Sequence, residues 1–102
     1  MDKRINAVKI HDDDNVITVT EGLRAGTSVR YLVHGKVREI LAAEDVPQYH
    51  KVALVEIPAS GRVTKYGQLI GEALTTIFKG GHVHDHNIAS PKKSSRAGES
   101  ST

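Results

Sequence analysis

Three histidines alternate with other residues near the end of the chain, in the segment GGHVHDHN at residues 80–87. Alternate residues of an extended strand face the same side, so the spacing predicts His82, His84 and His86 on one face. Residues two apart are separated by about 6.5–7 Å along a strand, and two imidazoles at that spacing can converge on one cation. The outer pair would lie about 13 Å apart. We therefore predict His82 and His84 as metal ligands, with His86 supporting them or joining them through a bend.

A solvated edge strand whose polar face carries histidine is the alternative interpretation of this segment. Gly80 and Gly81 precede the histidines and allow another backbone to approach closely, which favours a site. Two ligands from one strand need further ligands from elsewhere in the chain or from a partner. Imidazole binds zinc, iron, nickel and copper alike, so these residues do not select the metal.

The composition and the charge distribution narrow the class of protein. The 102 residues contain no cysteine, which excludes disulfides and thiolate metal sites and agrees with a cytoplasmic location. The net charge of +2 arises in the polar segment 91–102, which is predicted to be a disordered tail and leaves 4–90 as the folded unit. With no clustered basic face and no long apolar run, we expect neither nucleic acid nor a membrane as a partner.

The folded unit contains short β-branched runs separated by turn signals, which is typical of a mainly β domain. The runs lie at 5–10, 16–20, 28–41, 50–57, 68–77 and 82–88. A two-residue hairpin turn is predicted at 34–35, and it would set Arg30 opposite Glu39. Weak apolar spacing leaves a helix at 21–25 or 68–75 as an alternative.

An apolar residue is followed six positions later by valine four times, with turn-forming residues between. The four segments, which we call the first to fourth elbows, are 23–29, 46–52, 57–63 and 77–83. Each elbow is predicted to end one strand and to lead into the next. Ordinary β-protein turns explain the pattern equally well, and the irregular spacing excludes a solenoid. Both interpretations predict a compact all-β fold with many corners.

Several short motifs, taken in order, resemble a known family of domains. They are His50-Lys51, Lys65-Tyr66-Gly67 with Ile70-Gly71, His82-Val83-His84 and His86-Asn87. This order is similar to the N-terminal domain of the altronate and galactarate dehydratases and to the small subunit of sulfolactate sulfo-lyase, among the SAF domains. The resemblance runs from Asp14 to Asn87, and the sequence departs from the family at Asp85 and at Phe78-Lys79.

The resemblance implies a β-clip, a small single domain of short strands and long hairpins. It implies that the chain is the small subunit, or the N-terminal-domain equivalent, of a lyase that removes water from a sugar acid such as altronate or galactarate. The implied partners are that substrate and a large lyase subunit, and self-association is a further expectation. The implied cofactor is a divalent metal ion (iron, manganese or zinc), which would stabilise negative charge on the substrate carboxylate.

The resemblance also implies roles for individual residues outside the predicted metal ligands. Lys65 and Tyr66 would act in catalysis, and His50, Lys51 and Asn87 would bind the substrate. A hairpin tip at 65–67 with Tyr66 capping the core, and a turn at Asn87, are the structural alternatives. The carboxylates of the segment HDDDN are better explained by a turn with Asx hydrogen bonds than by a cation site.

Two other functions remain open at this point. The first is sulfite elimination from sulfolactate, because no residue separates a hydroxyl from a sulfonate leaving group. The second is a non-catalytic module that binds carbohydrate or metal.

Overall fold

The computed structural model describes residues 4–90, which form nine short strands and, within that range, no helix. The strands are β1 (Ala7–Val8), β2 (Val16–Val19), β3 (Ser28–Val33), β4 (Lys36–Leu41), β5 (Lys51–Ala53), β6 (Arg62–Lys65), β7 (Gln68–Ala73), β8 (His82–Val83) and β9 (Ile88–Ala89). The mainly β class is confirmed. The alternative helices are wrong, since 21–25 is irregular and β7 occupies most of 68–75. The predicted tail at 91–102 lies outside the described residues.

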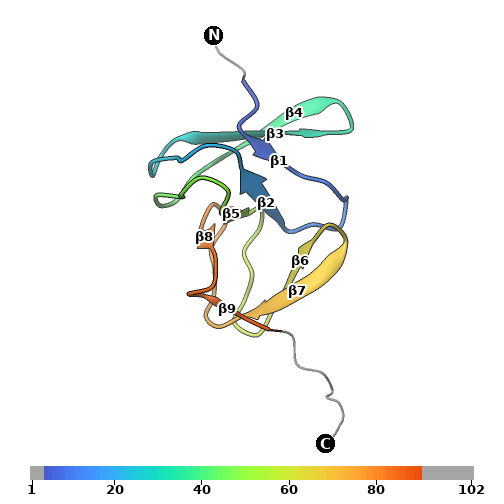
Figure 1. Ribbon diagram of the computed structural model, residues 1–102, viewed down its shortest axis with the longest axis vertical. Helices are drawn as coiled ribbons and strands as arrows, with labels where there is room; N and C mark the ends of the chain where they lie inside the picture. Colours follow the sequence, from blue (N-terminus) through green and yellow to red (C-terminus); the bar gives the residue numbers. More distant parts are fainter. Residues whose placement is uncertain (1–3, 91–102) are drawn as a thin grey trace, which may run out of the picture.

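The strands form three antiparallel sheets, which Figure 1 shows stacked along the molecule. One sheet has the order β1-β2-β5-β8, the second is the hairpin β3-β4, and the third has the order β6-β7-β9. A search of the described residues for a helix long and apolar enough to cross a membrane finds none.

Two long hairpins extend toward the same side of the molecule in Figure 1. The β3–β4 hairpin has the predicted register, with Arg30 opposite Glu39. Its turn residues His34 and Gly35 both have positive φ, 51° and 79°, as a two-residue type I′ turn requires. The β6–β7 hairpin turns in the same way at 66–67.

The four elbows share one backbone conformation, which confirms the common corner predicted from the sequence. In each elbow the fourth residue has positive φ: Gly26, Tyr49, Ser60 and Gly80. The fifth residue donates its N–H to the carbonyl of the second at 2.7–3.1 Å, the pattern of a type II turn. The first residues pair across the molecule, Leu23 with Val46 and Ile57 with Ile77. The elbows therefore stand in two pairs, one in each half of the fold.

The hydrophobic core follows this pairing and consists of two clusters. The first contains Leu23 and Val46 with the closing valines of their elbows, and the second contains Ile57 and Ile77 with theirs. All four closing valines are fully buried: Val29, Val52, Val63 and Val83. The elbow spacing in the sequence is thus the spacing between two buried positions that flank a turn, whose residues are exposed or partly exposed in the first three elbows, while Gly80 and Gly81 are buried in the fourth.

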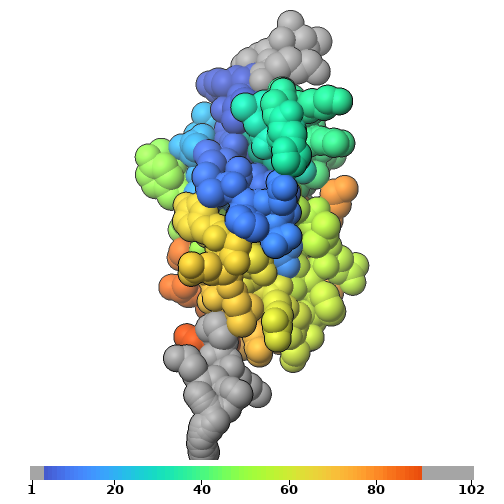
Figure 2. Space-filling view, turned by 90° about the vertical axis from the view of Figure 1, so that its right-hand side faces the viewer, coloured from blue at the N-terminus to red at the C-terminus, as the bar shows by residue number. Residues whose placement is uncertain are grey.

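The segment HDDDN lies between the two hairpin tips, as Figure 2 shows in blue between green and yellow. The buried carboxylate of Asp14 accepts the backbone N–H of Gly67 at 2.8 Å and that of His11 at 3.1 Å. Burial raises the pKa of Asp14, but these backbone hydrogen bonds outweigh burial and lower the pKa overall. At the tip of the β3–β4 hairpin, His34 Nε2 lies 3.1 Å from an Asp12 carboxylate oxygen. The turn interpretation of this segment is confirmed.

Candidate functional site

Four imidazoles meet where the second and fourth elbows lead into the paired strands β5 and β8. His50 is the fifth residue of the second elbow, and His82 is the sixth residue of the fourth. Val52 pairs with His82 in the β5–β8 ladder, so the two elbows run side by side. His84 and His86 follow in the turn after β8. The sequence separates His50 from the others by more than thirty residues, and the sheet brings it to them.

His50 and His82 form the closest contact of the cluster. Nδ1 of His50 and Nε2 of His82 are 2.7 Å apart, so one ring donates its proton and the other accepts it with a lone pair. His84 stacks on His50 with ring centroids 3.7 Å apart, and the His86 ring lies 4.9 Å from that of His82. Nδ1 of His84 is buried, and no described residue gives it a hydrogen-bond partner.

A turn replaces the continuous strand that the alternating histidines predicted. β8 ends at Val83, and the chain turns through 84–87 before β9. Asn87 holds the turn: its Oδ1 accepts the N–H of His84 at 2.9 Å, and its Nδ2 donates to the carbonyl of His82 at 2.7 Å. The prediction of one shared strand face is therefore wrong beyond Val83, because these side-chain hydrogen bonds bend the backbone. The bend brings His86 close to His82, as the prediction that His86 joins the other histidines through a bend requires.

The environment disfavours positive charge on the two rings in contact. Partial burial lowers the pKa of His82, and His86 and His50 lower it further, against Glu44, which raises it. Burial also lowers the pKa of His50, and His84 and Lys51 add to that effect. The lowered pKa values favour the neutral form of both rings, and the ring that donates in the His50–His82 contact keeps the lone pair of its other nitrogen available to a proton or to a cation.

Two carboxylates that sequence reasoning missed adjoin the imidazoles. Glu44 Oε2 accepts the backbone N–H of His82 at 2.9 Å, across 38 positions of sequence. Asp85 raises the pKa of His50 and that of Lys51. No local pattern marks Glu44, because only the packing of the second elbow beside the fourth brings it there. Asp85 lies between two histidines, and strand alternation would turn it away from their face, but β8 ends at Val83 before reaching it.

The predicted lysines lie beside this cluster. Lys51 is partly buried in β5, and burial followed by repulsion from Lys65 lowers its pKa. Lys65 ends β6, and its Nζ lies 4.7 Å from the centre of the Tyr66 ring, a cation–π contact. The structure thus places His50 and Lys51 beside the histidine segment, and Lys65 near enough to Lys51 to lower its pKa.

Tyr66 lies at a hairpin tip and Asn87 lies in a turn, as the structural interpretations of these residues predicted. The predicted capping of the core by Tyr66 is wrong. Tyr66 lies at the hairpin tip with φ 57°, but its side chain is 55% exposed and does not cap the core. Asn87 uses its amide oxygen and nitrogen within the turn. The catalytic role of Tyr66 and the contact of Asn87 with substrate stay predictions.

The imidazoles fit part of a metal coordination shell. Two imidazoles on one zinc ion have ring centroids about 5–6 Å apart, given Zn–N bonds of about 2.0–2.1 Å. His82 lies at about this spacing from all three other rings of the cluster, with centroid distances of 5.0 Å to His50, 4.9 Å to His86 and 6.0 Å to His84. The facing nitrogens of His50 and His82, 2.7 Å apart, would separate to about 3.3 Å for tetrahedral binding. Within residues 4–90 no group of three or more His, Asp or Glu side chains is arranged so that it could hold a metal ion, so the fit extends to pairs of imidazoles.

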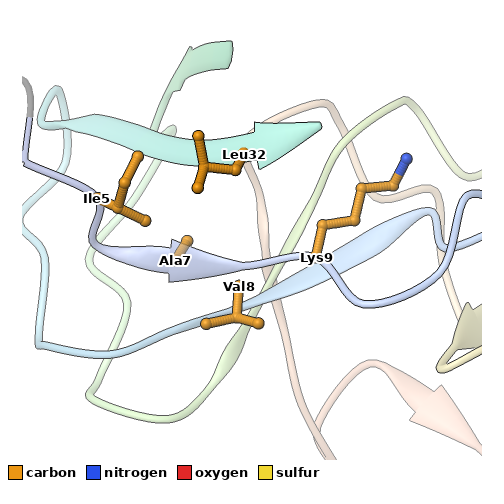
Figure 3. A pocket seen from close by; sticks show the side chains of 5 residues that line it. All are labelled: Ile5, Ala7, Val8, Lys9 and Leu32. Atoms are coloured by element: carbon orange, nitrogen blue, oxygen red, sulfur yellow. The ribbon is translucent and has the colours of Figure 1, made fainter. Parts of the chain in front are cut away.

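A small apolar pocket of about 200 Å³ lies elsewhere, between β1 and β3 (Figure 3). It is lined by Ile5, Ala7, Val8, Lys9 and Leu32. None of these residues belongs to the imidazole cluster or to the predicted site, so the pocket and the cluster are separate features.

Comparison with known proteins confirms the family resemblance that the order of the motifs indicated. Residues 5–91 match the family described as the altronate/galactarate dehydratase SAF domain. The chain is 36% identical over 87 residues to galactarate dehydratase (L-threo-forming) of Escherichia coli (strain K12), which is 83% of the chain and 15% of that protein. It is 40% identical over 80 residues to altronate dehydratase of the same organism, 78% of the chain and again 15% of the relative. It is 31% identical over 83 residues to (2R)-sulfolactate sulfo-lyase subunit alpha of Chromohalobacter salexigens, 78% of the chain and 88% of that subunit.

Proposed function

The chain belongs to the altronate/galactarate dehydratase SAF domain family, and we propose that it is the small module of a metal-dependent lyase that removes water from a sugar acid. The observation that carries the proposal is the gathering of four imidazoles and Lys51 beside β5 and β8. The chain spans only about 15% of the two dehydratases it matches, so a large lyase subunit would supply the remaining surfaces of the active site.

Elimination next to a carboxylate has two requirements that these residues suit. The negative charge that develops on the carboxylate must be stabilised, and a base must remove the neighbouring proton. A divalent ion, iron, manganese or zinc, would act as the Lewis acid when bound. His50 and His82 would hold it through their facing nitrogens, with His84 or His86 as a further ligand. Lys51 and Lys65 would attract the acid group of the substrate, because two ammonium groups at one site favour an anion.

The second candidate function is the small subunit of a sulfolactate sulfo-lyase. In its favour, the match covers 88% of the alpha subunit of that enzyme from Chromohalobacter salexigens. Identity does not separate the candidates, because the 36% and 40% of the two dehydratases lie between the values for two sulfo-lyase alpha subunits, 31% over 83 residues and 44% over 48 residues. Both candidates would use the same proposed cation ligands and anion-attracting lysines of this chain, so the leaving group decides between them.

The test is co-purification of the tagged full-length chain from its host, followed by metal analysis and elimination assays of whatever complex is recovered. Altronate, galactarate and sulfolactate are supplied in turn, and keto-acid formation and sulfite release are measured. Replacing His50 and His82 together with Ala should lower metal content and elimination rate at least tenfold, since the facing nitrogens are lost. The control His34→Ala removes an exposed imidazole at a hairpin tip, paired only with Asp12 in the described contacts, and should change neither.

Two outcomes would contradict the proposal. If the double variant keeps the metal content and the rate of the wild type, the imidazole cluster has no part in the reaction. If no large polypeptide co-purifies and the isolated chain binds carbohydrate or metal without chemistry, it is a binding module. A cytoplasmic location and self-association stay predictions.

A further inference from the structure

The backbone N–H and the backbone carbonyl of His82 point away from β5. Each is hydrogen-bonded to a side chain and not to another strand. β8 is the last strand of its sheet, and it pairs with β5 on one side only. Gly81, which precedes His82, turns its carbonyl toward β5 and accepts the N–H of Ala53 at 3.0 Å, so the N–H and carbonyl of His82 face away from β5. Glu44 accepts this N–H at 2.9 Å, and Asn87 donates to this carbonyl at 2.7 Å.

Glu44 reaches His82 because its backbone is tied to the fourth elbow. The neighbouring Ala43 donates its N–H to the carbonyl of Gly80 at 2.8 Å. Glu44 Oε2 lies only 3.6 Å from the place that a Cβ on Gly81 would occupy. The carboxylate is therefore packed against the segment that carries the histidines.

The internal repeat provides a comparison for this position. Glu21 lies two residues before the first elbow, as Glu44 lies two residues before the second. Glu21 forms an exposed ion pair with Arg4 at 2.9 Å, which is an ordinary surface contact. The first elbow thus has a glutamate at the same place with its carboxylate directed to the surface, whereas Glu44 is directed to a residue of the imidazole cluster.

We propose that Glu44 is a positioning residue of the imidazole site, which fixes the backbone of His82 and places a negative charge beside a bound cation. The inference rests on the proposed function, because it requires a cation at the imidazoles. A carboxylate that holds a metal ligand in place and adds negative charge nearby commonly raises metal affinity by about 10–100-fold. Glu44 does this through His82 and is not itself a catalytic residue.

The experiment uses the full-length chain and Zn²⁺ alone as the probe, with affinity measured by isothermal titration calorimetry. Glu44→Gln keeps an amide oxygen that can accept the His82 N–H but removes the charge, and it should bind Zn²⁺ about tenfold more weakly with an unchanged Tm. Glu44→Ala removes both functions, so hydrogen exchange at the His82 amide should also accelerate about tenfold. Glu21→Gln is the matched control and should bind within twofold of the wild type.

The outcomes separate this inference from the proposed function. Wild-type affinity in Glu44→Gln, together with weak binding in the His50 and His82 double variant, would overturn the role of Glu44 and leave the imidazole site standing. Equal Zn²⁺ affinity in the double variant and the wild type, or no binding by the wild type, would overturn the cation at the imidazoles and this inference with it. A normal exchange rate in Glu44→Ala would show that Glu44 does not hold His82.

Discussion

Alanine substitutions at two equivalent elbow positions should differ severalfold in their effect on stability. Gly26 and Gly80 are each the fourth residue of an elbow, with φ of 87° and 85°. Alanine in this left-handed region costs about 1–2 kcal/mol, and the smaller entropy of the unfolded alanine chain offsets about 0.5–1 kcal/mol of that. At Gly26 a Cβ would meet nothing within 4 Å, so we expect Gly26→Ala to lower the free energy of unfolding by about 1 kcal/mol.

At Gly80 the same backbone conformation is combined with a collision. A Cβ there would lie 2.2 Å from the carbonyl oxygen of Leu41 and 3.2 Å from the nitrogen of Ala43. Relief requires a backbone shift of about 1 Å, which disrupts the two 2.8 Å hydrogen bonds that Gly80 makes with Ala43 and Ala53. Each buried group left unsatisfied costs about 1–3 kcal/mol, so we expect Gly80→Ala to cost about 3–5 kcal/mol in total.

Urea unfolding followed by circular dichroism, with both variants at the same chain concentration, measures the difference. In a thermal scan the Tm should fall by about 4–8 °C for Gly26→Ala and by about 15 °C or more for Gly80→Ala. Because φ is nearly the same at both positions, 87° and 85°, the difference reports the packing of Gly80 against Leu41 and Ala43 and the hydrogen bonds that this packing allows. Equal losses in the two variants would refute the packing of the fourth elbow against that strand.

Three further predictions concern single polar groups. Asp14→Ala removes the acceptor for Gly67 and His11 and should lower the free energy of unfolding by about 1–3 kcal/mol, while an unchanged urea midpoint would contradict the buried carboxylate. The lowered pKa of Asp14 means that its stabilisation is complete above its ordinary value of 3.8 and is lost as pH falls through the folded pKa, an acid dependence that Asp14→Asn should reduce. The lowered pKa of His82 makes stability fall with pH in the same direction, but at higher pH. Its stabilisation is complete above the ordinary histidine pKa of about 6.5 and is lost as pH falls through the folded pKa. His82→Gln should flatten this dependence in unfolding midpoints measured from pH 8 to 5.

The parts of the fold that the sequence predicts are those determined by local rules. The β3–β4 register follows from a two-residue turn at 34–35 and from opposite charges at Arg30 and Glu39. The elbows follow from two buried positions that must be apolar and from a turn between them. At this level residue type and spacing are sufficient, because each interaction joins residues close in sequence.

The site was predicted less well because its geometry depends on contacts that no local pattern shows. The strand rule fails at His84, where the side chain of Asn87 bonds to the backbone of a tight turn. The contact between His50 and His82 depends on β5 pairing with β8, and that between Glu44 and His82 on the packing of two elbows. The resemblance to a family selected His50 although spacing alone gave no reason to place it beside the other histidines.

The repeat explains why the imidazoles gather at these two elbows and not at the others. The elbow requires a buried residue at its first and seventh positions and a tolerated positive φ at its fourth, whereas the residue types at its fifth and sixth positions differ among the four elbows. Those positions hold Thr27 and Ser28, His50 and Lys51, Gly61 and Arg62, and Gly81 and His82 in the four elbows. The first and third elbows lead into the separate hairpins of β3 and β6, but the second and fourth lead into β5 and β8, which pair with each other. Side chains at the fifth and sixth positions therefore meet only between the second and fourth elbows. Moving the His50-Lys51 pair to positions 27 and 28 would leave the fold intact without building the site.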